Sequence, residues 1–414
     1  MKVIEPYHCS GHIDAMCSKS YLQRAIAIAG LADSETLLTH IRWSDDSEAA
    51  RNAAKKLGAT FNEKGDKLLI KPGKIWNAEN LTLDVNESGL SLRMFACIAA
   101  LFDFPIVISG AGSLLNRPLD SLLETLQKTG VDVKSTNGKL PLMIKGPLNG
   151  GIIKINGSFS SQIISGLLIA LPLIKNDTVL EVAGLTSIPY VAMTLDIIRH
   201  FGVEIRHEQF KRFYIKGNQK YQGRTYQVEG DWSAAANFLV AAAISGELTV
   251  SGLNPVSKQA DKAILLALES FGAEIRWQEK NLLVKQKEKK PFQFDATHCP
   301  DLFPPLVVLA AACSGTSRIR GTQRLLHKES DRLYTLIDTF HKLGVSLAAQ
   351  GNDLLVHGTG SIKGNTISSH NDHRIAMAAA VAATLSEKEI KIKQAEAVNK
   401  SYPLYFEDLK TLME

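Results

Sequence analysis

The stretch RHFGVEI, residues 199–205, holds the pattern that decides the fold: a helix end, a glycine and then alternating apolar residues. Gly202 fits the position just after a helix, where glycine adopts a left-handed backbone at little cost. The residues after it alternate as in a strand with one buried face. The same step recurs every 70 to 72 residues, in KKLGAT, QKTGVDV, ESFGAEI and HKLGVSL, at Gly58, Gly130, Gly272 and Gly344.

A second series of polar clusters has the same period, and each cluster precedes an apolar helix. The clusters lie at Lys19, Gly89, Ser160, Asp231, Asp301 and Asp372, 70 or 71 residues apart. The chain therefore holds six units of about 70 residues, each with strands, a buried helix and an amphipathic helix. This period exceeds that of solenoid repeats, so we expect α/β units grouped into domains. Helices as apolar as 236–244 and 375–385 need burial on most sides, with the sheets outside.

Composition limits the classes of function. The chain has 414 residues and a net charge of +5 without a dense basic block, which predicts small anionic ligands rather than nucleic acid. Its longest apolar stretches, such as 163–174, are shorter than the ~20 residues of a membrane span. The first residues, MKVIEPYHCSGH, hold no apolar run of signal-peptide length, and the five cysteines form no CxxC pair. We therefore expect a cytoplasmic protein that binds no membrane.

The polar clusters stand at expected helix starts, where unpaired N–H groups and the helix dipole favour anions. Simple capping explains polar residues such as Ser160, Asp231 and Asp301 one at a time. Capping does not explain why cationic or titratable side chains occupy the same positions, because a cation there is unfavourable unless an anion is bound. These side chains are Lys19, Arg93, His373 and Arg374. The pattern favours anion binding.

Two of the clusters suit particular anions. Ser20 and Arg24 are four residues apart on one helix face and suit a single carboxylate, although Lys-Ser pairs are also common at helix starts. The hydroxyls and the amide of SFSSQ, residues 158–162, suit a phosphate and equally fit a serine-rich turn.

The last third of the chain holds titratable clusters with alternative interpretations. The motif HKESDRL, residues 327–333, is typical of a charged surface helix, yet Glu329 between cations also suits an acid or base. His373 fits a structural histidine, whereas Arg374 opens an apolar helix and favours an anion. Lys400, taken alone, is typical of an exposed lysine. We find neither metal-ligand spacing nor a nucleotide-binding glycine loop.

Together these residues resemble the enolpyruvyl transferase family, in the branch that acts on shikimate 3-phosphate. The matching motifs follow in order over nearly the whole chain: SKSYLQRA (18–25), ESGLSLR (87–93), RPLDSLLETLQKTG (117–130), SSQIISGLL (160–168), SIPYVAMTLDIIRHFGV (187–203), VEGDWSAAANFL (228–239), HKESDRL (327–333), NDHRIAMA (371–378) and KSYPLYFEDL (400–409). The resemblance implies an α/β fold with two domains of three repeats each. Residues 13–227 would form the first domain and 1–12 with 228–414 the second, which the N-terminal strand joins.

The resemblance also implies a reaction. The enolpyruvyl group of phosphoenolpyruvate would pass to the 5-hydroxyl of shikimate 3-phosphate by addition and elimination, releasing phosphate. This step belongs to the shikimate pathway, which leads to chorismate and the aromatic amino acids. The family needs no metal or organic cofactor, and we expect a monomer whose only partners are the two substrates.

Roles for individual residues are implied in the same way. Phosphoenolpyruvate binding falls to Lys19, Gly89, Arg117, Gln162, Arg332, Arg374 and Lys400. Shikimate 3-phosphate binding falls to Ser20, Arg24, Ser160, Ser161, Gln162, Ser187, Asp301 and Lys328. Proton transfer falls to Asp301, Glu329 and Lys19, and supporting roles to Arg93, Tyr190 and His373.

Three departures from the family pattern stand out. Met16-Cys17 replaces a Pro-Gly step, Asn86-Glu87 replaces Gly-Asn, and Arg324 stands where Asn is common. An acidic Glu87 near the phosphoenolpyruvate site would weaken binding of that anion or of an inhibitor. Gly89 is retained where a larger residue would crowd the pocket, so we predict inhibition by glyphosate.

Two alternatives remain open. A related transferase acts on a UDP-amino sugar and carries a catalytic cysteine in a loop of its first domain. This chain has no cysteine between Cys97 and Cys299, which argues against that acceptor. A non-catalytic anion-binding relative that regulates or scaffolds is the other alternative. Retention of the charged set Lys19, Asp301, Glu329 and Arg374 argues against it.

Overall fold

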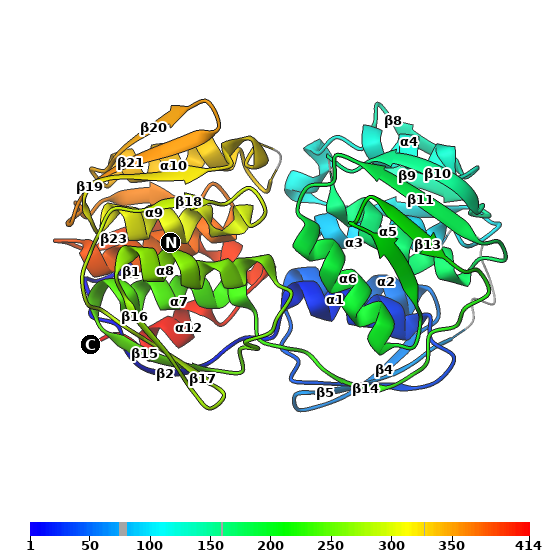
Figure 1. Ribbon diagram of the computed structural model, residues 1–414, viewed down its shortest axis with the longest axis horizontal. Helices are drawn as coiled ribbons and strands as arrows, with labels where there is room; N and C mark the ends of the chain where they lie inside the picture. The colour runs from blue at the N-terminus through cyan, green and yellow to red at the C-terminus, as the bar shows by residue number, and fades with distance from the viewer. Residues whose placement is uncertain (74–80, 159, 327) are drawn as a thin grey trace. The chain divides into compact units, whose positions relative to one another are not determined.

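The computed structural model describes residues 1–73, 81–158, 160–326 and 328–414 (Figure 1). These residues form two compact units, which we call the middle unit (17–228) and the terminal unit (1–16 with 229–414). The sequence predicts residues 13–227 for the first of these units. Residues 159 and 327, from the SFSSQ and HKESDRL motifs, lie outside the described residues.

One repeat of the middle unit shows the plan of the others. Strand β6 (Leu81–Asp84) leads through helix α3 (Gly89–Ala99) to β7 (Ile106–Ser109), which pairs with β6 in parallel. Helix α4 (Asp120–Lys128) then leads to β8 (Asp132–Thr136) and β9 (Lys139–Lys145). The sheet order is β6-β7-β9-β8, with β9 antiparallel to both of its neighbours.

The glycine step ends the amphipathic helix of each such repeat for a local reason. After α4, Gly130 has a φ of +80°, and the Val131 N–H bonds to the Leu126 carbonyl over 3.2 Å. This is the closing bond of a Schellman motif, which requires the left-handed residue that glycine supplies. The equivalent glycines also have positive φ and are followed by the same bond: Gly58, Gly202, Gly272 and Gly344.

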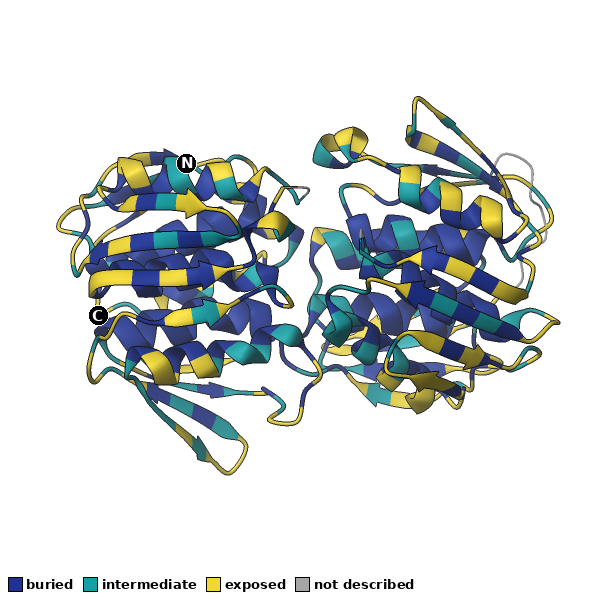
Figure 2. Cartoon of the chain, turned by 45° about the horizontal axis from the view of Figure 1, so that its top comes forward, coloured by how far each residue is buried: buried dark blue, intermediate teal, exposed yellow. Residues whose placement is uncertain are grey.

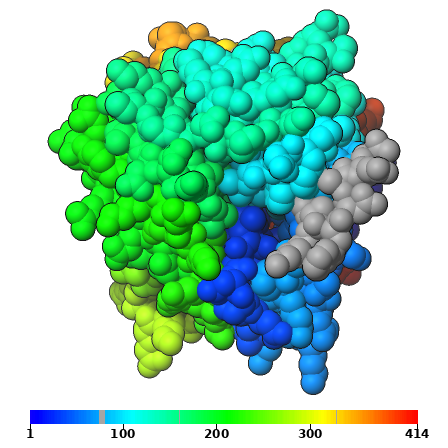
Figure 3. All heavy atoms as spheres, turned by 90° about the vertical axis from the view of Figure 1, so that its right-hand side faces the viewer, coloured from blue at the N-terminus to red at the C-terminus, as the bar shows by residue number. Residues whose placement is uncertain are grey.

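The other repeats of the middle unit follow the same plan, with sheet orders β14-β3-β5-β4 and β10-β11-β13-β12. Their strands are β3 (Thr36–Thr39), β4 (Thr60–Lys64), β5 (Lys67–Lys71), β10 (Gly151–Asn156), β11 (Thr178–Ala183), β12 (Ile205–Glu208), β13 (Arg212–Ile215) and β14 (Thr225–Gln227). Their helices are α1 (Lys19–Gly30), α2 (Asp45–Lys56), α5 (Ser161–Ala170) and α6 (Ile188–His200). Figure 3 shows these repeats from outside, coloured blue to green along the chain.

The terminal unit has repeats of the same plan and includes the first residues of the chain. Its sheets have the orders β16-β17-β15-β2, β18-β19-β21-β20 and β1-β23-β22. Its strands are β1 (Lys2–Ile4), β2 (Ser10–Asp14), β15 (Glu247–Ser251), β16 (Glu274–Gln278), β17 (Asn281–Lys285), β18 (Gln293–Asp295), β19 (Ser314–Arg320), β20 (Ser346–Gln350), β21 (Asp353–Thr359), β22 (Thr366–Ser368) and β23 (Ile390–Lys393). Its helices are α7 (Trp232–Ser245), α8 (Ile264–Phe271), α9 (Phe303–Ala311), α10 (Arg332–Lys342), α11 (His373–Ala382) and α12 (Tyr405–Lys410).

Strand β2 pairs in parallel with β15, and β1 pairs with β23 antiparallel. The pairing of β2 explains why residues up to 16 belong to the terminal unit. The last repeat is short, as expected from the sequence, because its sheet has three strands and α12 follows in place of a further hairpin.

The hydrophobic core of each unit surrounds its apolar helices. Every residue of α7 is buried, and so is every residue of α11. The strands outside them alternate, as in β9, where buried and exposed side chains take turns along the sheet (Figure 2). This arrangement removes the apolar helix faces from water and confirms the predicted α/β repeats with helices inside and sheets outside.

Candidate active site

The polar clusters that begin the buried helices fall into two classes. Most of them supply the N-cap, including Ser18 for α1, Ser160 for α5 and Asp231 for α7. Asp301 is different, because it lies in the short 3₁₀ helix η4 (Pro300–Leu302) and its carboxylate bonds to cationic side chains. Capping therefore accounts for Ser160 and Asp231, whereas it is the wrong explanation for Asp301.

In the middle unit, two guanidinium groups meet at the start of α3. Arg93 donates to the Gly89 carbonyl over 3.0 Å and to Oε1 of Gln162 over 3.2 Å. A Cβ atom on Gly89 would lie 2.7 Å from Arg117 Nη1 and 3.1 Å from Arg93 Nη1. Any other residue there would force at least one of these groups to shift. The predicted residues Gly89, Arg93, Arg117 and Gln162 are thus brought together.

The electrostatics of this cluster favour an anion. Burial, together with the nearby charge of Arg117, lowers the pKa of Arg93 to about 10. The two oxygens that Arg93 contacts, on Gly89 and Gln162, carry no net charge. A bound phosphate or carboxylate would offset both the desolvation and the repulsion, and the N-terminus of α3 adds N–H dipoles of the same sign. We call Gly89, Arg93, Arg117 and Gln162 the paired-arginine cluster.

Glu87 lies two residues before Gly89, and its carboxylate accepts hydrogen bonds. Its Oε2 accepts from the backbone N–H and from the hydroxyl of Ser113, both over 2.9 Å. Ser113 belongs to the 3₁₀ helix η1 (Gly112–Asn116), which immediately precedes Arg117. Glu87 therefore stabilises the turn that precedes Arg117. This contact is one that the sequence did not indicate.

Lys19 begins α1, and its ammonium group lies 2.8 Å from Oδ2 of Asp46 in the first turn of α2. Both side chains are 15% exposed. Sequence reasoning missed Asp46, whose only signal was a pair of acidic residues at a helix start. The pair brings a charged lysine and a carboxylate together at the edge of two helix N-termini.

Arg24 is 1% exposed and joins three helices. It donates to the Ser20 carbonyl over 2.8 Å, to Thr194 Oγ1 over 2.8 Å and to Ser165 Oγ over 3.3 Å. Burial lowers its pKa to about 10. Ser20 and Arg24 do share one turn of α1, as the spacing indicated. Their binding of a carboxylate stays a prediction, and the contacts shown tie Arg24 to the protein itself.

The serine residues lie in neighbouring loops of the third repeat. Ser160 caps α5 by accepting from the Gln162 N–H over 3.2 Å, and Ser161 begins that helix. Ser187 precedes α6 with a φ of +54°, a conformation uncommon for a residue with a side chain. The Thr186 hydroxyl donates to the Ser158 carbonyl over 3.2 Å and links the two loops. Tyr190, in the first turn of α6, accepts from Arg24 through its carbonyl over 3.4 Å.

In the terminal unit, a network of carboxylates surrounds Arg332. This side chain is fully buried, and it contacts Asp301 over 2.8 Å, Glu329 over 2.5 Å and Asp372 over 3.0 Å. Burial alone would lower the pKa of Arg332, but Asp372, Glu329 and Asp301 raise it. The prediction of an ordinary charged surface helix is therefore wrong for Arg332, which begins α10 beneath the surface.

Asp301 is the shared acceptor of this network. Its Oδ1 lies 2.8 Å from Arg332 and 3.5 Å from the Lys328 ammonium group, and its Oδ2 lies 3.2 Å from Arg374. Burial favours the protonated form, but Arg374, Lys328 and Arg332 outweigh it and hold the pKa of Asp301 well below its ordinary value. Asp301 is therefore ionised at neutral pH. Burial lowers the pKa of Lys328. We call Asp301, Lys328, Glu329, Arg332, Asp372 and Arg374 the carboxylate–guanidinium network.

His373 and Lys400 are buried near the same helix start. His373 is 1% exposed, with its Nδ1 3.8 Å from Asp372. Lys400 is 7% exposed and donates to the Asn371 carbonyl over 2.8 Å. The interpretation of Lys400 as an exposed lysine is wrong, because it lies in the 3₁₀ helix η7 (Ala395–Lys400) under α11. Asp372 caps α11 and also binds Arg332, a role that sequence reasoning, which noted Asp372 only as the marker of a polar cluster, did not assign to it.

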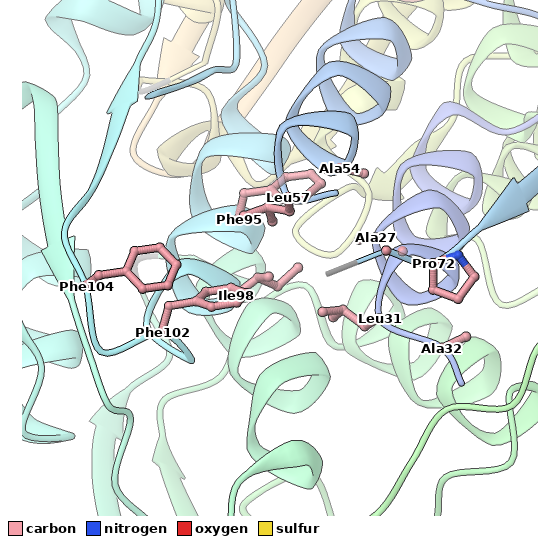
Figure 4. Close-up of a pocket in the computed structure, with 12 residues that line it drawn as sticks. Ala27, Leu31, Ala32, Ala54, Leu57, Pro72, Phe95, Ile98, Phe102 and Phe104 are labelled. Carbon is pink, nitrogen blue, oxygen red and sulfur yellow. The ribbon is translucent and has the colours of Figure 1, made fainter. Parts of the chain in front are cut away.

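Other features of the described residues lie apart from these clusters. No group of three or more His, Cys, Asp or Glu side chains there is arranged to hold a metal ion. Nor does that part of the chain contain a helix long and apolar enough to cross a membrane. An apolar cavity of about 400 Å³ in the middle unit is lined by side chains such as Leu57, Phe95 and Phe104, and contains no predicted site residue (Figure 4).

The chain is similar to known proteins over nearly its whole length. Residues 4–409 match the family model of EPSP synthase (3-phosphoshikimate 1-carboxyvinyltransferase). A 3-phosphoshikimate 1-carboxyvinyltransferase of Clostridium acetobutylicum is 39% identical, covering 99% of this chain and 96% of that protein. One of Methanocorpusculum labreanum is 35% identical, covering 99% and 98%.

Solved structures share the fold. The structure of EPSP synthase from Acinetobacter baumannii superposes with a TM-score of 0.83 at 24% identity, covering 99% of this chain and 98% of that one. That identity supports the architecture alone, whereas the family model and the curated relatives identify the lineage. The chain belongs to the EPSP synthase family.

Proposed function

We propose that this chain transfers the enolpyruvyl group of phosphoenolpyruvate to the 5-hydroxyl of shikimate 3-phosphate, in the pathway to chorismate and the aromatic amino acids. In the addition step, the 5-oxygen bonds to C2 of phosphoenolpyruvate, C3 gains a proton and the hydroxyl loses one. In the elimination step, the C2–O bond to phosphate breaks and C3 loses a proton. The products are the enol ether and inorganic phosphate.

The observation that carries the proposal is the paired-arginine cluster at the start of α3. Both substrates are multiply charged anions, each with a phosphate and a carboxylate. Arg93 and Arg117 approach each other over Gly89, and Arg93 bonds only neutral oxygens in the contacts given above. Charge-assisted hydrogen bonds from guanidinium groups suit phosphate and carboxylate. We assign phosphoenolpyruvate to this cluster together with Lys19, Arg332, Arg374 and Lys400.

Shikimate 3-phosphate is assigned to the hydroxyl-rich loops of the third repeat and to the start of α1. Ser160, Ser161 and Ser187 would bind its phosphate, as hydroxyl and N–H donors at helix starts do in general. Ser20 and Arg24 would bind its carboxylate. Asp301 and Lys328 would bind its ring hydroxyls, since Asp301 is ionised and accepts hydrogen bonds.

Proton transfer requires an acceptor for the hydroxyl proton and a donor for C3. Glu329 and Asp301 are the carboxylates available in the carboxylate–guanidinium network, and Arg332 fixes both. Lys19 is the proposed donor, with Asp46 beside its ammonium group. The same groups would act in reverse during elimination.

The proposal is tested by phosphate release from the purified chain with phosphoenolpyruvate and one of two acceptors, shikimate 3-phosphate or a UDP-amino sugar. We expect release only with shikimate 3-phosphate. Release only with the sugar would assign the related transferase activity instead. Binding of the substrates without release from either acceptor would favour a non-catalytic relative.

Glyphosate is expected to inhibit that release, because Gly89 has no side chain to crowd Arg93 and Arg117. The assay is repeated with increasing glyphosate at fixed substrate concentrations. Unchanged activity in excess glyphosate would contradict this expectation, and Glu87→Gln would then be the first variant to examine.

We further propose a cytoplasmic monomer. All five cysteines are buried thiols, which fits a reducing compartment. Light scattering of the purified chain tests the oligomeric state, and a mass near twice 45.2 kDa would contradict it.

A further inference from the structure

Asp261 is a buried acid that none of the roles above uses. It lies in the 3₁₀ helix η3 (Ala260–Ala263), between β15 and α8, and is 4% exposed. Its Oδ2 accepts a hydrogen bond from the Ser233 hydroxyl, in the first turn of α7. Its Oδ1 is buried and has no hydrogen-bond partner among the described residues. A buried carboxylate with an unsatisfied oxygen is costly and calls for a reason.

Ser233 connects this acid to the carboxylate–guanidinium network. The Arg374 Nη2 group donates to the Ser233 hydroxyl oxygen over 3.1 Å and lies 3.2 Å from Oδ2 of Asp301. Arg374 is thus shared by two acids, one reached directly and one through a hydroxyl. Burial and the charge of Asp301 together raise the pKa of Asp261 to about 7, against the opposing charge of Arg374.

The loop before Asp261 is held by hydrogen bonds of Gln259 and Ser257. Gln259 donates to a Glu229 carboxylate oxygen over 2.7 Å and to the Gly230 carbonyl over 2.7 Å, and its own Oε1 accepts from the Trp232 N–H over 3.1 Å. The Ser257 hydroxyl also donates to Glu229. These bonds restrain the loop. The Asp261 carboxyl therefore stays buried, although its burial is unfavourable.

We propose that Asp261 is a positioning residue that holds the Arg374 guanidinium through Ser233 and shares its positive charge with Asp301. The inference rests on the proposed function, in which Arg374 binds phosphoenolpyruvate and Asp301 contacts the acceptor. An ionised Asp261 anchors Arg374 and reduces the field that Arg374 exerts on Asp301. When Asp261 is protonated, it no longer reduces the field of Arg374 at Asp301. The other titratable groups that face Asp261 are Asp231 and Cys299.

The first test is the pH dependence of kcat/KM for phosphoenolpyruvate in wild type, Asp261→Asn and Ser233→Ala. Because Asp261 ionises near pH 7, wild-type kcat/KM should rise through that pH. Both variants should lose this rise and lie roughly tenfold below wild type at pH 8. The double variant should be no worse than either single one, because both break one connection. A wild-type profile in Asp261→Asn, or additive losses in the double variant, would overturn the proposal.

Asp353→Asn is the matched control, since it removes a carboxylate of the same unit that pairs with Arg318 and Arg320 on β19. It should keep the wild-type pH profile. If this control lost the rise as well, the effect would belong to general charge loss and the proposal would fail.

The second test needs no turnover and therefore separates this inference from the proposed function. A carboxylic acid whose folded pKa exceeds its unfolded value of about 3.9 contributes stability below that value, and this stability is lost as pH rises to the folded pKa. Urea unfolding should thus show Asp261→Asn gaining stability relative to wild type between about pH 4 and pH 7. A pH-independent difference would overturn the proposal. Absence of phosphate release from wild type with either acceptor would instead refute the proposed function.

Discussion

The paired-arginine cluster and the carboxylate–guanidinium network differ in how the positive charge of their arginines is balanced. In the first, Arg93 bonds neutral oxygens beside a second guanidinium group, so the charge of Arg93 is left for a ligand to neutralise. In the second, Arg332 contacts three carboxylates and its charge is matched inside the protein. The first arrangement is suited to capturing an anion. The second is suited to fixing acids in position and controlling where a proton goes.

The difference shows in the pKa values as well. Burial and like charge lower the pKa of Arg93, whereas neighbouring carboxylates raise that of Arg332 against the effect of burial. One guanidinium is destabilised until a ligand arrives, and the other is stabilised by the fold. We therefore expect variants of the first cluster to affect mainly KM, and variants of the proton-transfer acids Asp301 and Glu329 in the second to affect mainly kcat.

The largest effect is expected from Glu329→Gln, which keeps the shape of the side chain and removes its ability to accept a proton. We expect kcat to fall roughly 10²- to 10⁴-fold with KM for phosphoenolpyruvate little changed. Arg332 keeps Asp301 and Asp372, so the fold should persist. Steady-state kinetics checks this, with Asp338→Asn in α10 as the control. A kcat near that of wild type would remove Glu329 from the proton-transfer pair.

A smaller effect is expected from Arg117→Lys, which keeps the charge and loses the planar donor pair. KM for phosphoenolpyruvate should rise roughly 10- to 100-fold while kcat changes less. Arg51→Lys is the control, because Arg51 lies over the Trp43 ring and pairs with Glu48, outside the cluster. A loss confined to kcat would contradict the division of roles between the two regions.

Gly89→Ala tests the space between the two guanidinium groups. The added Cβ would lie 2.7 Å from Arg117 Nη1, so one of the side chains must move. We expect KM for phosphoenolpyruvate to rise about tenfold. Gly30→Ala is the control in α1, where the added Cβ would make an ordinary contact of 3.6 Å with Ala54. Unchanged affinity in Gly89→Ala would show that the paired arginines do not bind this substrate.

The smallest effect is expected at Glu87. Glu87→Gln keeps an oxygen for Ser113 and removes a negative charge, so KM for phosphoenolpyruvate should fall slightly, by roughly threefold at most. Glu87→Ala loses both bonds, frees the turn before Arg117, and should raise the same KM. Equal KM values in the two variants would mean that Glu87 does not position Arg117.

The sequence sufficed for the repeated fold and for much of the candidate site because both follow from local rules. The glycine step at Gly130 is closed by a bond within six residues, and apolar helices such as α7 must be buried wherever they lie. Helix starts attract anions for reasons that the sequence pattern already contains. The family motifs then placed Asp301 and Arg374 in named roles, which the experiments above test.

The remainder depends on contacts between distant segments. Asp261 and Ser233 are 28 residues apart and reach Arg374 a further 141 residues from Ser233, with no local pattern to connect them. The burial of Lys400 follows from how the chain end folds under α11, and its own neighbours in the sequence suggest exposure. The sequence did not indicate the structural role of Glu87, because its partner, Ser113, is 26 residues away.

The most direct test of enolpyruvyl transfer by addition and elimination is to run the reaction in D₂O and examine the enol ether by NMR. C3 of phosphoenolpyruvate should become a methyl group that has gained deuterium and then lose hydrogen or deuterium, so the vinyl group of the product should contain deuterium. A product without deuterium in its vinyl group would contradict the protonation of C3 that Lys19, Asp301 and Glu329 are proposed to support.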